Sequence, residues 1–192
     1  MKINEALQKL IEGNRRFATS ESVHPNQTAE RRTEVSKGQK PFAVIVGCSD
    51  SRVPPEIIFD QGLGDLFIIR VAGNIVDKVA LGSIEYAVDH LGTELVLVLG
   101  HGNCGAVTAS VKGGKVHGHV GSIVRAITPA VKKAKKQPGD LIDNSIKTNV
   151  KLIVNQIRSS KPILSKLVKE DKLKIVGAYY NIENGVVDII TN

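Results

Sequence analysis

The stretches Phe42-Ala43-Val44-Ile45-Val46-Gly47-Cys48 and Leu95-Val96-Leu97-Val98-Leu99-Gly100-His101 are short apolar runs, each ending in a side chain suited to a soft metal ion. Such runs, rich in Val, Ile and Leu, are typical of strands buried on both faces of a parallel sheet. Neighbouring parallel strands point the same way, so the residues just past their ends meet at one edge of the sheet. We therefore expect Cys48, His101 and Cys104 to converge there. Two thiolates and an imidazole would hold a zinc ion and leave a fourth coordination position open, as catalytic zinc sites do.

The composition is that of one soluble globular domain covering residues 1–192. Hydrophobic residues make up 42% of the chain and charged residues 23%, which is ordinary for this class. Residues 1–17 carry Lys, Glu and Arg among their apolar residues, so they lack a secretory hydrophobic segment. No apolar run reaches the roughly 18 residues of a membrane span. We expect a cytoplasmic protein, in which two cysteines are more often metal ligands or free thiols than a disulfide.

The formal net charge is +7, and part of the excess lies in a cluster of lysines at positions 132, 133, 135 and 136. A basic surface can attract nucleic acid or a membrane. No helix-turn-helix, zinc-finger or aromatic stacking pattern accompanies these lysines, so we interpret them as the solvated face of a helix. The sequence predicts no nucleic-acid partner and no membrane partner.

The order of predicted elements indicates an α/β fold whose main sheet is parallel. Strands are predicted at 42–47, 66–71, 95–100, 173–180 and 186–190. The last two are joined by Glu183-Asn184-Gly185, and Asn-Gly is a favoured hairpin turn. Helices are predicted at 3–17, 27–37, 79–91, 106–111, 122–136, 141–158 and 162–170, with a short one after Pro54-Pro55. In such folds ligands bind outside the carboxyl ends of the strands, where the predicted metal ligands lie.

A charged pair lies directly beyond the first predicted ligand. Asp50 follows Cys48 by two residues, close enough to reach a bound metal ion or its water, and Arg52 follows Asp50 by two more. The planar fork of an arginine suits a carboxylate that must be held in a fixed direction. An aspartate held in this way stays ionised and accepts a hydrogen bond from bound water. The structural alternative is an ordinary salt bridge in a turn.

The segment Cys48-Ser49-Asp50-Ser51-Arg52, followed by Gly100-His101-Gly102-Asn103-Cys104-Gly105, resembles the two signature motifs of the β-class carbonic anhydrases. The resemblance spans most of the chain. The other matching positions are Gly38-Gln39, Phe67, Arg70, Ala72-Gly73-Asn74 and Ile84-Glu85-Tyr86-Ala87-Val88. It implies a Rossmann-like, mainly parallel sheet of four strands plus a C-terminal edge strand, flanked by helices. It also implies one zinc ion per subunit, held by Cys48, His101 and Cys104, and a homodimer or larger assembly with active sites at the subunit interface. Residues 1–40 would form an N-terminal helical arm that packs on the dimer partner.

The activity that this resemblance implies is that of a carbonate dehydratase, a lyase. Such an enzyme reversibly hydrates carbon dioxide to bicarbonate and a proton through zinc-bound hydroxide. By similarity, Asp50 orients the hydroxide and Arg52 holds Asp50 away from the metal.

The resemblance also implies residues that contact the substrate or carry the proton. The Gln39 amide would donate a hydrogen bond to the forming bicarbonate. Its place at the start of a helix, rather than the resemblance, makes the Gly105 backbone N–H a further candidate donor. Phe67 and Tyr86 would form apolar walls of the carbon dioxide pocket, unless they only pack in the core. His90 lies four residues after Tyr86 on the same helical face and would act as a proton shuttle, unless it is an ordinary surface histidine.

One subgroup of this family has a closed state, in which the aspartate replaces the water on zinc and bicarbonate occupies a second, inhibitory pocket. That pocket relies on a tryptophan, and this chain has none. The composition therefore favours the plant-like, open type, with zinc-bound water at neutral pH.

Two other interpretations fit parts of the sequence. Hydrolases of carbonyl sulfide or carbon disulfide share this fold and ligand set, although Gln39 favours carbon dioxide. A non-catalytic protein with structural zinc or bound nucleic acid is the second alternative, and the intact pair Asp50 and Arg52 argues against it. A redox dithiol is disfavoured because Cys48 and Cys104 do not form a Cys-x-x-Cys motif.

Overall fold

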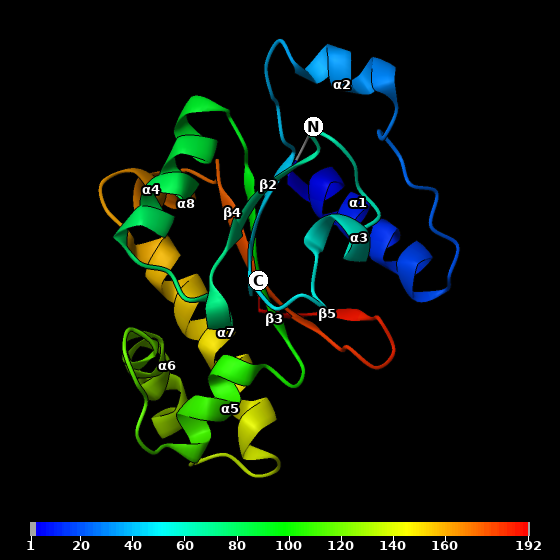
Figure 1. The fold of residues 1–192 in the computed structure, drawn as a ribbon. Coiled ribbons are helices and arrows are strands. Elements are labelled where there is room, and N and C mark those ends of the chain that lie inside the picture. Colours follow the sequence, from blue (N-terminus) through cyan, green and yellow to red (C-terminus); the bar gives the residue numbers. More distant parts are fainter. Residues whose placement is uncertain (1–2, 192) are drawn as a thin grey trace.

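A central five-stranded sheet organises the chain, in a computed structural model that describes residues 3–191 (Figure 1). The strand order is β2-β1-β3-β4-β5, and β5 is antiparallel to β4 while the other neighbours are parallel. The strands are β1 (Ala43–Gly47), β2 (Leu66–Arg70), β3 (Leu95–His101), β4 (Lys174–Tyr180) and β5 (Val187–Thr191). This confirms the predicted four-stranded parallel sheet with a C-terminal edge strand.

Helices lie on both faces of the sheet. The long helices are α1 (Ile3–Ala18), α6 (Val120–Ala134) and α7 (Leu141–Ser159). The short helices are α2 (Ala29–Val35), α3 (Pro55–Ile58), α4 (Lys78–Glu85), α5 (Gly105–Lys112) and α8 (Ile163–Lys169), with a 3₁₀ turn at Ala72–Asn74. Residues of the predicted helix 79–91 beyond Glu85 form a π-helical turn at Tyr86–His90, closed by a hydrogen bond from Leu91 N to Tyr86 O.

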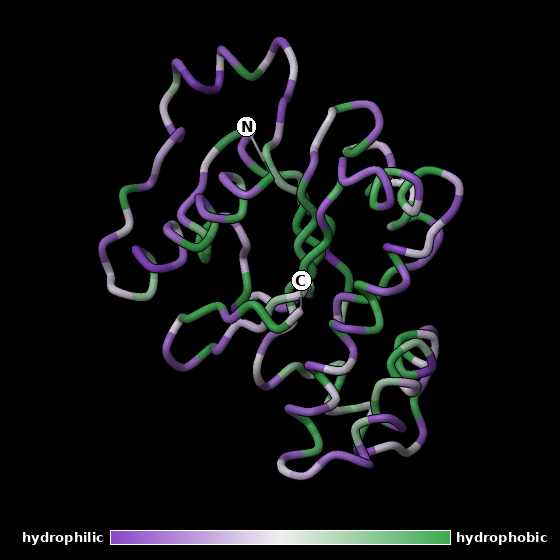
Figure 2. The backbone as a smooth tube through the Cα atoms, turned by 180° about the vertical axis from the view of Figure 1, so that it is seen from behind, coloured by the Kyte–Doolittle hydropathy of each residue, from purple (hydrophilic) through white to green (hydrophobic). Residues whose placement is uncertain are grey.

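The alternation of side chains in β1 divides the core into two layers. Val44 and Val46 point to the face covered by α4, α7 and α8, whereas Ala43 and Ile45 point to the face covered by α1 and α3. All five β1 residues are buried. Figure 2 shows hydrophobic residues concentrated in the central strands and many hydrophilic residues in the loops and helices around them. The sheet is therefore buried on both faces, as its apolar runs predict.

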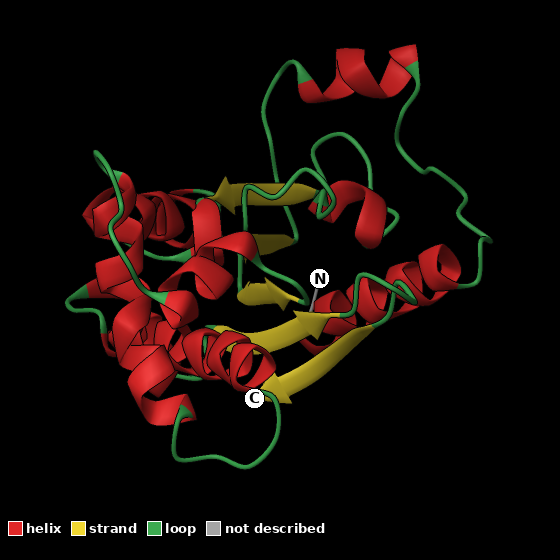
Figure 3. Cartoon of the chain, turned by 60° about the horizontal axis from the view of Figure 1, so that its bottom comes forward, coloured by secondary structure: helices red, strands yellow, loops and turns green. Residues whose placement is uncertain are grey.

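The N-terminal region contains one helix that is buried against the sheet and one that contacts the rest of the chain only at its surface. Ala6 and Leu10 of α1 are buried against the sheet, and the Asn14 amide donates to the carbonyls of Ile58 and Gly185 at 3.2 and 2.8 Å. By contrast, α2 has no buried residue and stands away from the sheet (Figure 3). Packing of residues 1–40 on a partner subunit stays a prediction.

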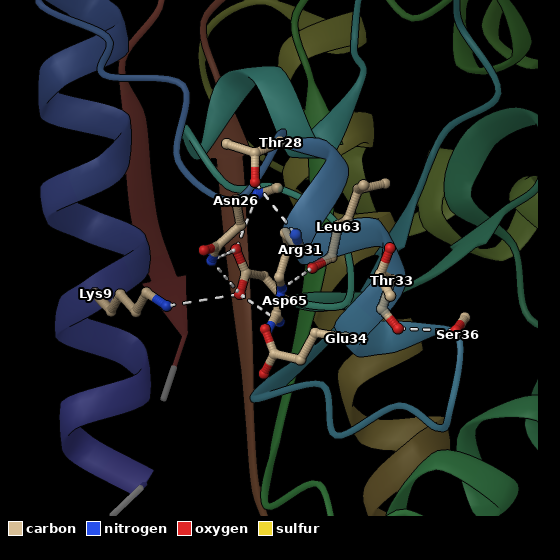
Figure 4. A network of polar contacts seen from close by, with 10 residues as sticks. Lys9, Asn26, Thr28, Arg31, Thr33, Glu34, Ser36, Leu63 and Asp65 are labelled. Carbon is tan, nitrogen blue, oxygen red and sulfur yellow. Dashed lines mark hydrogen bonds and ion pairs between the residues drawn. The ribbon is translucent and has the colours of Figure 1, made fainter.

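A buried carboxylate fixes the loop that leads to α2 (Figure 4). Asp65, directly before β2, accepts hydrogen bonds from Asn26 Nδ2 at 2.8 and 3.0 Å and from Gly62 N at 2.9 Å. Arg31 and Lys9 place their charges 3.8 and 4.0 Å from its Oδ1 atom. We call this set, Lys9, Asn26, Arg31, Gly62 and Asp65, the Asp65 network. It lies at the amino end of the parallel strands.

None of the helices formed by residues 3–191 combines the length and the apolar character that crossing a membrane requires.

Candidate metal centre

Three side chains converge at the carboxyl ends of β1 and β3. Cys48 follows the last residue of β1, His101 is the last residue of β3, and Cys104 directly precedes α5. The two strands are parallel neighbours, with Gly47 opposite Leu99, so both chains leave the sheet at the same edge. The two Sγ atoms and a ring nitrogen all lie within 4.8 Å of one another, and all three residues are buried. This is a group that could hold a metal ion.

The hydrogen bonding of His101 leaves one ring nitrogen free for a metal. Its Nδ1 atom lies 2.9 Å from the carbonyl oxygen of Gly102. A carbonyl only accepts hydrogen bonds, so Nδ1 carries the proton and Nε2 keeps its lone pair. Nε2 is buried and has no hydrogen-bond partner. Metal-bound histidines show this arrangement, in which a second partner fixes the tautomer.

The donor set fits a soft divalent ion. Cys48 and Cys104 form no disulfide, and both are buried, unlike a reactive surface thiol. Two thiols and an imidazole supply three of the four ligands of a tetrahedral site. Among the residues that the structure describes, no fourth His, Cys, Asp or Glu joins this group. The arrangement therefore matches a site with one open coordination position.

The pKa values of the two thiols are displaced in opposite directions. A hydrogen bond from Cys104, opposed by burial and assisted by His101 and by the N–H of Gly73, lowers the pKa of Cys48. The same pairing, together with burial, raises the pKa of Cys104. A bound cation favours the thiolate form of both.

Asp50 is held beside this group by Arg52. The guanidinium donates from Nε to Asp50 Oδ1 at 2.9 Å and from its terminal nitrogen to Oδ2 at 2.8 Å, and Arg52 N donates to Oδ1 at 3.0 Å. The side-chain hydrogen bond from Arg52 is the main cause that lowers the pKa of Asp50 well below its usual range. Asp50 Oδ2 lies 3.9 Å from His101 Nε2. An ionised carboxylate therefore faces the ligand group in a fixed orientation.

Two arginines connect the segments that carry the site. Arg52 also donates to the carbonyl of Asn103 at 3.2 Å, which joins the segment after β1 to the segment between His101 and Cys104. Arg70, at the end of β2, donates to the carbonyls of Cys48 and Asp50 at 2.8 and 2.5 Å. Arg70 is one of the positions that match the family pattern, but the pattern indicates no role for it. The structure shows that it holds the backbone on which both a ligand and the carboxylate lie.

Gln39 lies far from the metal centre of its own chain. It is exposed and precedes β1, whereas Cys48 follows β1. The five residues of that strand extend over about 16 Å. The side chain lies at the opposite end of the sheet from the group that it was predicted to assist.

Three further predicted residues form an aromatic cluster at the edge of the sheet. Phe67 is the second residue of the edge strand β2, and its ring centroid lies 6.2 Å from that of Tyr86. Tyr86 in turn lies 5.3 Å from the ring of His90, and its side chain is 47% exposed. We call Phe67, Tyr86 and His90 the edge aromatic cluster. It lies outside the buried group of Cys48, His101 and Cys104.

Gly105 lies directly at the centre, as the first residue of α5 after Cys104. A Cβ atom at this position would meet no other atom within 4 Å, so the space beside its backbone is open. Its N–H belongs to the first turn of a helix, where backbone donors lack partners within the helix.

Comparisons with known proteins agree with these observations. A family model described as carbonic anhydrase matches residues 43–187. The chain is 40% identical over 184 residues to carbonic anhydrase 2 of Mycobacterium tuberculosis, which covers 94% of this chain and 89% of that protein. It is 39% identical over 188 residues to the carbonic anhydrase of Mycolicibacterium smegmatis, with 96% and 91% covered.

A solved structure shows a similar fold over almost the whole chain. The β-carbonic anhydrase of Coccomyxa, in complex with acetazolamide, has a TM-score of 0.75 at 29% identity and covers 96% of this chain and 86% of that chain. The family match spans Cys48, Asp50, Arg52, His101 and Cys104. The sheet, the group able to bind a metal and the sequence comparisons together show that this chain belongs to the β-carbonic anhydrase family.

Proposed function

We propose that this protein catalyses the zinc-dependent, reversible hydration of carbon dioxide to bicarbonate and a proton. The observation that supports this most directly is the unpartnered Nε2 atom of buried His101, close to two thiols and to a carboxylate held by an arginine. Cys48, His101 and Cys104 would hold one zinc ion per subunit. When bound, zinc lowers the pKa of a coordinated water and so supplies hydroxide near neutral pH.

Asp50 and Arg52 orient the reacting water in this proposal. The Asp50 carboxylate accepts a hydrogen bond from the water, which directs an oxygen lone pair toward the carbon of carbon dioxide. Both oxygens of Asp50 already accept from Arg52, so the carboxylate stays ionised and is restrained from turning onto the metal itself. Arg70 supports the same geometry from the backbone side. We retain the open-type interpretation because the chain has no tryptophan for an inhibitory pocket.

The remaining substrate contacts require a second subunit. Gln39 precedes β1 and the edge aromatic cluster lies at β2, so neither lines the metal centre of the chain that carries it. We propose a homodimer in which Gln39 of one subunit reaches the centre of the other and donates to the forming bicarbonate. Phe67 and Tyr86 would form the apolar wall, His90 would receive the proton, and Gly105 N–H would assist the bicarbonate oxygen. The exposed helix α2 would supply part of the contact surface.

We expect the enzyme to work in the cytoplasm, where a reducing environment keeps thiols such as Cys48 and Cys104 free.

A stopped-flow assay of carbon dioxide hydration, with zinc measured in the same sample, tests the proposal. We expect one zinc ion per chain and a rate that scales with zinc content. Sulfide release from carbonyl sulfide is measured in parallel, because a hydrolase on the same fold would prefer that substrate. A protein that contains zinc but does not accelerate hydration would disprove the proposed activity.

A further inference from the structure

Asn149 is a buried polar residue on the face that α7 packs against the rest of the molecule. Ile146, Val150 and Ile153 form the apolar part of this face, and Asn149 is 2% exposed. Burial of an amide without hydrogen bonds costs about 1–3 kcal/mol. Helix packing alone therefore gives no reason for an asparagine here, and the reason must lie in what its amide contacts.

The contact is with the backbone beside the metal centre. Asn149 Nδ2 donates to the carbonyl oxygen of Gly73 at 3.0 Å, and both residues are buried. Gly73 lies in the 3₁₀ turn after β2, with φ at 70°. This left-handed conformation favours glycine, and a Cβ atom there would also lie 2.7 Å from Ile127 Cδ1 and 3.2 Å from Ala106 Cβ.

Gly73 contacts the metal centre through its other backbone group. Its N–H donates to Cys48 Sγ at 3.2 Å. The glycine is thus held at its carbonyl by Asn149 while its N–H is directed at a predicted metal ligand. The carbonyl contact crosses 76 residues of sequence, and the sulfur contact crosses 25.

We propose that Asn149 is a positioning residue of the metal centre, which acts through Gly73 on the sulfur of Cys48. By fixing Gly73, it keeps the N–H···S hydrogen bond aligned, which orients the sulfur and draws negative charge from it. Two thiolates cancel the formal charge of a divalent ion, so donors to sulfur help the ion to keep its Lewis acidity. Partners of this kind affect metal affinity or activity by about 10–100-fold. The inference rests on the proposed function in taking zinc as the metal.

The test compares Asn149→Leu with Gln156→Met. Leucine has the branched shape of asparagine without its hydrogen-bonding atoms. Gln156 is a matched control because its Nε2 donates to the carbonyl of Val76 at 2.9 Å, again from α7 to the segment after β2 but without contact to the centre. Zinc dissociation constants are measured by competition with a chromogenic chelator. We expect the constant to rise about 10–100-fold in Asn149→Leu and to match the parent protein in Gln156→Met.

Cobalt substitution gives a second readout that does not depend on catalysis. Loss of the hydrogen bond raises electron density on sulfur, so the thiolate-to-cobalt charge-transfer band should move to lower energy in Asn149→Leu and stay unchanged in Gln156→Met. Unchanged affinity and spectrum in Asn149→Leu would overturn the inference, as would equal changes in both variants. If Asn149→Leu does not fold, Asn149→Ala is measured against the same predictions. Failure of the parent protein to hydrate carbon dioxide would disprove the proposed function while leaving these readouts valid.

Discussion

The two ends of the parallel strands both gather polar side chains, but they differ in how fully these are hydrogen-bonded. At the amino end, both carboxylate oxygens of Asp65 accept hydrogen bonds from Asn26, and two cations lie within 4.0 Å. At the carboxyl end, His101 Nε2 is buried without a hydrogen-bond partner, beside two thiols that form no disulfide. The Asp50 side chain at this end accepts hydrogen bonds from Arg52, so it is the histidine nitrogen, and not the carboxylate, that lacks a partner.

This difference separates stabilisation from function. A buried polar group that is fully paired contributes to the folded state, whereas one that lacks a partner costs free energy. A centre of this second kind is stabilised when a ligand supplies the missing contacts. We therefore expect changes at the amino end to alter stability and changes at the carboxyl end to alter catalysis.

Metal removal should have the largest effect. Dialysis against a strong chelator is expected to reduce carbon dioxide hydration to the uncatalysed rate and to lower the melting temperature, because three buried ligand atoms lose their shared partner. One equivalent of zinc should restore both. Activity that survives with no metal detected by mass spectrometry would contradict the assignment of Cys48, His101 and Cys104.

Arg52→Ala should have the next largest effect and should act mainly on catalysis. Without the guanidinium, the Asp50 carboxylate would no longer be held in its orientation and would be able to bind the metal ion in place of water. We expect kcat to fall about 100–1000-fold, the range seen when one oriented polar group is lost from an active site. The zinc content should stay at that of the parent protein.

Arg52→Lys is the matched control for this variant. It keeps the positive charge but loses the planar fork that contacts both oxygens of Asp50. We expect an activity between that of Arg52→Ala and the parent. Full activity in either variant would show that the fork does not restrain Asp50.

Asp65→Asn should have a moderate effect on stability and little effect on chemistry. The substitution removes a buried charge and places an amide group against the Nδ2 donor of Asn26. We expect a loss of about 1–3 kcal/mol in the free energy of unfolding, or about 2–4 °C in melting temperature per kcal/mol for a chain of this size. Guanidinium denaturation measures the former and stopped-flow kinetics should show an unchanged kcat. A variant of normal stability but impaired kcat would reverse the proposed difference between the two ends.

The sequence predicts the central strands and the metal ligands at their ends well. The strands are apolar runs because both faces of the sheet are buried, so β1 and β3 were found with bounds that differ by one residue at most. The metal ligands follow directly from these strands, and parallel pairing brings their ends together. Local pattern and topology are sufficient for this part of the centre.

Contacts over long sequence separations were not predictable in the same way. Arg70 and Asn149 donate hydrogen bonds to backbone carbonyls. Every residue has a backbone carbonyl, so a sequence motif does not indicate which one a distant side chain will contact. The only signal for Asn149 was an amide among the isoleucines and valines of an amphipathic helix. The π-helical turn at Tyr86–His90 was missed because its residues continue the helical pattern of α4. The role of Gln39 is hard to predict for a different reason, because its proposed contact with a metal centre requires a second chain.

The smallest predicted effect is a dependence of stability on pH that arises at Asp60, which contacts α1 and the loop that follows it. Burial opposes ionisation of this carboxylate, but Arg16 at 2.6 Å and the N–H groups of Val23 and His24 outweigh it and lower the pKa of Asp60. The unfolded chain then binds more protons than the folded one between the folded pKa and the unfolded value of about 3.9. The stabilisation is therefore complete above about pH 4 and is lost as the pH falls below that value.

Asp60→Asn should be less stable at pH 7 but should lose less further stability on acidification than the parent, as measured by urea denaturation from pH 7 to pH 3. Parallel stability curves for the two proteins would show that Asp60 makes no such contribution.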